Sequence, residues 1–136
     1  MKKSHVWISI FVLLWSLMGV LAYLGQAYMD DTMFAALPVD QQNYYENLPS
    51  WVTAAFATAV FSQLLASILL LMKKALSFWF FIIAFVAVIF QLTYNLFLQT
   101  DMNLGGSDYI MPFLIISINV LFIYYSKKNK EEGFLK

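Results

Sequence analysis

Residues 51–98 read WVTAAFATAVFSQLLASILLLMKKALSFWFFIIAFVAVIFQLTYNLFL, and their only charged residues are Lys73 and Lys74. The apolar stretches on either side, 51–72 and 75–98, each exceed the roughly 20 residues that a helix needs to cross a hydrocarbon core. The short lysine turn between them predicts a tight antiparallel helical hairpin. This stretch decides the fold class, because unpaired backbone groups cannot face lipid and the chain must therefore cross it as helices.

Two further apolar stretches flank this hairpin, at residues 6–28 and 109–125, and neither contains Asp, Glu, Lys or Arg. Across the chain, 62% of residues are hydrophobic and 12% are charged, against roughly 45–50% and about 25% in soluble domains. The sequence therefore predicts an all-α membrane protein, a four-transmembrane-helix bundle that forms one domain over residues 1–136.

The start of the chain has one alternative interpretation. Lys2 and Lys3 followed by an apolar run resemble a secretory signal, with residues 25–27 (GQA) as a cleavage site. The apolar run from Val6 to Leu24 is longer than the usual 7–15 residues of a signal sequence, so we expect an uncleaved first span.

Lysines and acids divide between the two sides of the predicted bundle. Every basic residue lies before the first span, between the second and third, or after the fourth: Lys2, Lys3, Lys73, Lys74, Lys127, Lys128, Lys130 and Lys136. The charged residues of the other two loops are all acidic. Because positive loops stay in the cytoplasm, we expect both termini to be cytoplasmic in a bacterial inner membrane.

The segments outside the apolar core of the spans carry four further expectations. The outer loop 29–50 has helix-start signals at Asp30 and Asp40, so it predicts two short helices separated by Pro38. The second outer loop, 99–108, holds a Gly-Gly-Ser turn. We expect the cytoplasmic tail 126–136 to be polar and frayed, and the lone His5 to be an interfacial residue, since it has no co-ligands for a metal.

Polar residues inside the predicted spans are the candidate site. Counting along each span places Gln63 and Asn119 near the midplane, Gln91 in the outer half and Asn95 nearer the outer surface. Such amide groups hydrogen-bond between helices in many membrane bundles, so packing is one interpretation. The other is a ligand site for a sugar, quinone or lipid headgroup, with Trp15 and Tyr94 as stacking surfaces.

Several functions are excluded or disfavoured by composition. Eight basic and eight acidic residues cancel, so nothing indicates nucleic-acid binding. No ionisable residue lies within a span, which argues against a proton relay or a cation-coupled carrier. We expect no enzyme activity, no catalytic residue, no metal site and no cofactor.

Three functions stay open from the residues alone. The first is a non-catalytic accessory or assembly subunit that binds a lipid or small ligand and contacts other membrane subunits. The second is a small-solute transporter, which would act as a homodimer or larger oligomer because four helices enclose little space. The third is a quinone-linked helper, supported only by aromatic surfaces.

Three stretches carry a resemblance to known proteins. The first span contains WSLMGV at 15–20, and the acidic loop ends in LPSWVTAAFA at 48–57, with LLLMKKA at 69–75. This order resembles a family of small four-span bacterial inner-membrane proteins that are often labelled sugar transporters, and more distantly the DoxX-like four-helix membrane proteins. The resemblance implies a four-helix bundle in a bacterial inner membrane. Gln63 departs from the family pattern, which has a small residue there.

Overall fold

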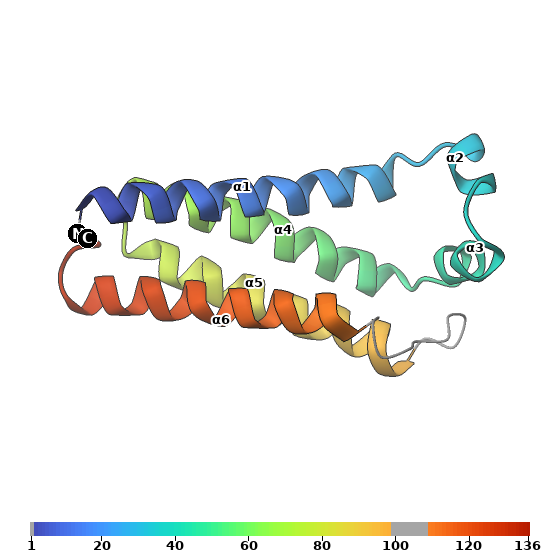
Figure 1. Cartoon of the computed structure of the whole chain (residues 1–136). Helices are drawn as coiled ribbons and strands as arrows, with labels where there is room; N and C mark the ends of the chain where they lie inside the picture. The colour runs from blue at the N-terminus through green and yellow to red at the C-terminus, as the bar shows by residue number, and fades with distance from the viewer. Residues whose placement is uncertain (1, 99–108) are drawn as a thin grey trace.

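The computed structural model describes residues 2–98 and 109–136, and every regular element among them is a helix. Four long helices lie side by side: α1 (Lys2–Ala27), α4 (Ser50–Leu71), α5 (Leu76–Thr93) and α6 (Ile110–Glu131) (Figure 1). Each of the four is long and apolar enough to cross a membrane. The prediction of an all-helical chain with four such helices is confirmed.

The helix bounds differ from the predicted spans at two places. Beyond Thr93 the third span continues as a π-helical segment, η1 (Tyr94–Leu98), which no sequence signal indicated. The fourth helix continues past the predicted end at residue 125 to Glu131, because the lysines that follow are good helix formers and favour the negative end of the helix dipole. Hydropathy identifies only the apolar part of this helix, whereas the helix itself includes the polar residues that follow. The predicted loop 99–108 lies outside the described residues.

The two ends of the bundle are built differently. Both termini and the turn between α4 and α5 lie at one end, named here the terminal end. The short helices α2 (Asp31–Ala35) and α3 (Val39–Glu46) lie at the other, named the cap end (Figure 1). The Asp30 carboxylate accepts a hydrogen bond from the Met33 N–H at 2.7 Å and so caps α2. The two predicted short helices are therefore confirmed.

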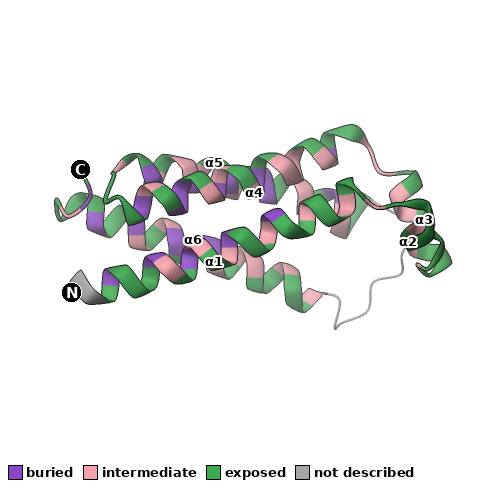
Figure 2. Cartoon of the chain, turned by 90° about the horizontal axis from the view of Figure 1, so that it is seen from above, coloured by how far each residue is buried: buried purple, intermediate pink, exposed green. Residues whose placement is uncertain are grey.

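The long helices pack in chain order, α1 on α4, α4 on α5 and α5 on α6. A Cβ atom added at Gly19 of α1 would lie 3.2 Å from Cγ1 of Val60 of α4, so glycine permits this close approach. Buried residues line the facing sides of the helices, and exposed residues cover their outward faces (Figure 2). This packing leaves α1 and α6 to meet across the remaining side of the bundle.

Apolar side chains fill the terminal half of the bundle. The core there is formed by Val12, Ala66, Leu70, Phe81 and Phe122, with Leu135 of the tail. The Phe11 and Phe122 rings, 6.4 Å apart between centroids, join α1 to α6 at this level. This ring contact therefore joins the first and the last of the long helices in the terminal half.

The tail after α6 folds back onto this core, so the prediction of a frayed tail is wrong. Gly133 adopts a φ of 80°, a left-handed conformation that glycine adopts without strain. The N–H of Phe134 donates to the Asn129 carbonyl oxygen at 2.9 Å, and the N–H of Lys136 donates to the Lys73 carbonyl oxygen at 2.9 Å. Leu135 is only 3% exposed. Counting charges had overlooked the two apolar residues that anchor the tail.

His5 lies at the terminal end, as its position predicted, but it is buried rather than interfacial, with 2% of its surface exposed. The ring atom Nε2 lies 2.9 Å from the Leu70 carbonyl oxygen, and Nδ1 lies 2.6 Å from the Tyr125 hydroxyl oxygen. A carbonyl oxygen only accepts, so the Nε2–H donates to Leu70, and in the neutral ring Nδ1 then accepts from the Tyr125 O–H. The Phe134 ring covers the imidazole edge-on at 4.7 Å between centroids, and this cover explains why the interfacial expectation is wrong.

The His5 contacts give a test of how the terminal end is held. Tyr125→Phe removes the hydroxyl group and leaves the buried Nδ1 atom without a donor, which costs about 1–3 kcal/mol. We expect a lower midpoint of thermal unfolding in detergent. Tyr124→Phe is the control, because the Tyr124 ring is 61% exposed. Equal midpoints for the two variants would contradict this account of the terminal end.

Candidate functional site

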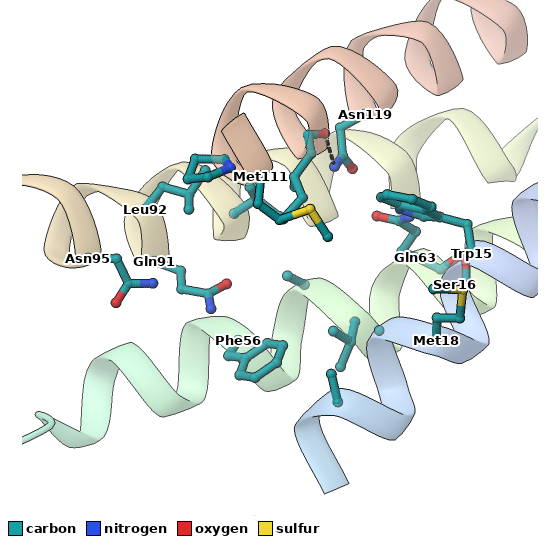
Figure 3. A pocket seen from close by; sticks show the side chains of 17 residues that line it. Trp15, Ser16, Met18, Phe56, Gln63, Gln91, Leu92, Asn95, Met111 and Asn119 are labelled. Atoms are coloured by element: carbon teal, nitrogen blue, oxygen red, sulfur yellow. Dashed lines mark hydrogen bonds between the residues drawn. The ribbon is translucent and has the colours of Figure 1, made fainter. Parts of the chain in front are cut away.

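A cavity of about 440 Å³ lies among the four long helices. It begins beside Trp15 and Gln63 and extends along the bundle to Asn95, at the start of η1 (Figure 3). Its lining combines apolar side chains with a few polar ones, contributed by every long helix: Trp15, Ser16, Met18, Gly19, Ala22, Phe56, Ala59, Val60, Gln63, Val88, Gln91, Leu92, Asn95, Met111, Pro112, Ile115 and Asn119.

Small residues create the space. Gly19 and Ala22 of α1 face the cavity from one side, and Ala59 of α4 from another. The same small side chains let α1 and α4 approach closely. On α6, Met111, Ile115 and Asn119 follow one another at intervals of four residues, and therefore share one face of the helix.

Five of the six predicted site residues line this one cavity: Trp15, Gln63, Gln91, Asn95 and Asn119. They come from α1, α4, α5, η1 and α6, so residues far apart in sequence are brought together. Figure 3 shows the amide groups of Gln63, Gln91 and Asn119 around a common space, with the Trp15 ring beside Gln63. Binding by these residues stays a prediction.

Tyr94, the sixth, is not among the lining residues. Its ring packs at the cap end, 5.9 Å from the Trp51 ring and 6.2 Å from the Tyr44 ring between centroids. Tyr94 therefore packs against the short helix α3, which with α2 forms the cap of the bundle, whereas Asn95 borders the cavity.

Asn119 is the most deeply buried amide of the cavity, with 2% of its surface exposed. Its Nδ2 atom donates to the Ile115 carbonyl oxygen at 2.8 Å, and this bond fixes which way the amide faces, because a carbonyl oxygen cannot donate. The remaining atom, Oδ1, is buried and has no hydrogen-bond partner among the described residues. Ser77 Oγ shares this condition but is not among the residues that line the cavity.

Ser16 and Gln63 form the boundary of the cavity toward the terminal end. The Ser16 hydroxyl oxygen lies 2.8 Å from the Val12 carbonyl oxygen and 3.3 Å from the backbone carbonyl oxygen of Gln63. The serine therefore ties α1 to α4 through the backbone. The Gln63 side chain is left beside the cavity, although only 6% of the residue is exposed.

The cap meets the cavity at Asn95. The Tyr44 hydroxyl group of α3 donates a hydrogen bond to Asn95 Oδ1. Burial, with smaller contributions from Tyr45 and Tyr94, raises the pKa of Tyr44 to about 12, so the hydroxyl group keeps its proton at neutral pH. Tyr44 is thus a permanent donor to Asn95.

The lining residues permit noncovalent binding. They include no Asp, Glu, Lys or His, and the described residues hold no group of three or more His, Cys, Asp or Glu that could bind a metal ion. Amides supply donors and acceptors, and the apolar side chains supply the surface for a hydrocarbon body. A charged ligand would find no counter-charge there, so the cavity favours an uncharged one.

Some lining residues could not be identified from the sequence. Met111 lies two intervals of four residues before Asn119, and this spacing was the available signal for it. Pro112, beside it at the start of α6, gave no signal. Met18 and Phe56 gave none, because they resemble ordinary apolar residues of a span.

Comparison with protein-family models, with curated proteins and with solved structures found no match to this chain. The chemistry of the cavity is therefore argued from its own residues.

Proposed function

We propose that this chain is a non-catalytic, multi-pass protein of a bacterial cytoplasmic membrane that binds a lipid or another small amphiphile and serves as an accessory subunit. The observation that carries the proposal is the cavity, whose lining combines amide groups with apolar surface and holds no ionisable side chain. A site of this kind suits an uncharged molecule taken from the bilayer.

Membrane insertion is supported by the outward faces of the bundle. Large apolar side chains are exposed there: Trp7 is 72% exposed, Phe113 68% and Leu121 62%. In water such a surface would favour aggregation, whereas in a bilayer it meets hydrocarbon. Membership of the family of small four-span inner-membrane proteins that the sequence resembles belongs to the same proposal.

Orientation is supported by the charges at the two ends. Lys73, Lys74 and the lysines after residue 126 lie at the terminal end, and the acids of residues 30–46 lie at the cap end. The positive-inside rule places the terminal end in the cytoplasm. Lys130 fits this placement, because its ammonium group lies 5.4 Å from the centroid of the Trp79 ring, an arrangement suited to a membrane interface.

Orientation can be tested by labelling single cysteines, since the chain has none of its own. We expect Asp40→Cys to react with a membrane-impermeant maleimide in intact spheroplasts, because α3 would face outward. Lys128→Cys should react only after the membrane is permeabilised. The reverse pattern would refute the proposed orientation.

We prefer binding to transport because packed residues separate the cavity from the terminal end. A carrier needs access to its site from both sides of the membrane in turn. The packed core, His5 and the folded tail occupy the path from the cavity to the terminal end. Transport by an oligomer remains the alternative, and it would require these contacts to open.

Filling the cavity tests the proposed function. Ala22 lines the cavity at an exposed position, so Ala22→Phe places a ring at the edge of the cavity, whereas Leu21 does not line it and Leu21→Phe places a ring on a face where Leu21 is 66% exposed. We expect native mass spectrometry in mild detergent to find a small molecule on the unaltered chain and on Leu21→Phe, and less of it on Ala22→Phe. An unaltered chain without any bound small molecule, or equal occupancy in both variants, would refute the proposal.

A further inference from the structure

We infer that the ligand of this cavity is an uncharged amphiphile with a hydroxyl group, and that the hydroxyl group donates a hydrogen bond to Oδ1 of Asn119. This inference rests on the proposed binding function and adds the chemical class of the ligand. The unpartnered, buried oxygen atom of Asn119 is the observation behind it.

The direction of the hydrogen bond follows from the asparagine itself. The Nδ2 atom is held by the Ile115 carbonyl oxygen at 2.8 Å. Rotating the amide to present nitrogen to the cavity would set two acceptors, Oδ1 and the Ile115 oxygen, against each other. Asn119 therefore offers an acceptor, and a ligand that completes it must carry a donor such as an O–H group. A ketone or an ether cannot complete it.

The rest of the lining describes the body of the ligand. Apolar side chains border most of the cavity, including Phe56, Val60 and Leu92, so the body is hydrocarbon. A volume of about 440 Å³ lies within the range of about 300–1,000 Å³ that is usual for small-molecule sites, so the cavity has room for a medium-chain alcohol. Met18 and Met111 border the same space, and their flexible side chains can adjust to the ligand.

Trp15 provides a built-in probe, because its ring borders the cavity beside Gln63 (Figure 3). Replacing the other three tryptophans, Trp7, Trp51 and Trp79, by Phe leaves Trp15 as the only indole. Bromine quenches indole fluorescence on contact. The two probes are 2-bromododecan-1-ol and its methyl ether, which carry the bromine beside the oxygen atom, match in chain length and bromine position, and differ in the donor.

We expect the alcohol to quench Trp15 at about a tenfold lower concentration than the ether, which corresponds to one hydrogen bond to a buried acceptor. A second single-tryptophan chain that keeps only Trp7, which is 72% exposed on the outside of the bundle, measures how far each probe partitions into the detergent or bilayer. On that chain the two probes should quench alike. Asn119→Leu should remove the advantage of the alcohol at Trp15.

The outcomes separate the inference from the function on which it rests. If the alcohol and the ether quench Trp15 equally, and both do so more strongly than they quench Trp7, ligand binding stands and the hydroxyl group is overturned. If neither probe quenches Trp15 more strongly than Trp7, both the hydroxyl group and ligand binding are overturned. Because the probes are compared on an unaltered Asn119, the result does not depend on whether Asn119→Leu folds.

Discussion

His5 joins three separate segments of the chain, because its two ring nitrogens bond to Tyr125 of α6 and to the Leu70 carbonyl oxygen at the end of α4, while Phe134 of the tail covers the ring. In a hydrocarbon surrounding, a buried polar group without a partner is costly. At the terminal end the His5 ring meets this constraint with partners of the chain's own. The folded tail, the turn at Lys73 and the packed core around Phe81 lie beside these contacts.

Along the rest of the bundle, not every buried polar group finds a hydrogen-bond partner in the part of the chain that the structure describes. There the small residues of α1 and α4 leave space, and Asn119 keeps an acceptor without a partner among the described residues. The cap uses Asn95 through the Tyr44 hydroxyl group, whereas Gln63 and Gln91 border the cavity. The terminal half is thus packed with apolar side chains around the His5 contacts, whereas the other half holds a cavity bordered by amide groups.

Hydropathy and charge were sufficient to predict four long helices, their order and the two short helices after Asp30, because these features depend on local composition. Counting along the spans also brought Gln63, Gln91, Asn95 and Asn119 to one region, since it gives the depth of each amide within its span. The burial of His5 could not be predicted in this way. It depends on Tyr125, which lies 120 residues later in the chain, and on the fold of the tail, and sequence position alone does not encode such contacts.

Tyr94 shows the second limit. A uniform helix through residue 98 was expected, and the π-helical segment that begins at Tyr94 has no signature in composition. Nothing in the sequence distinguished the ring that faces the cap from the amide beside it that faces the cavity. Local patterns thus identified polar and aromatic residues within the spans, whereas packing between helices decided which of them line one cavity.

Spin labels on α6 test the central claim, a closed terminal half and an open cavity, most directly. Ile115→Cys and Phe122→Cys lie two turns apart on one face of the helix, the first in the cavity lining and the second in the packed core, and the chain has no other cysteine. We predict a mobile, oxygen-accessible label at residue 115 and an immobilised, oxygen-shielded label at residue 122. A label at residue 115 as immobile and as shielded as that at residue 122 would contradict the account.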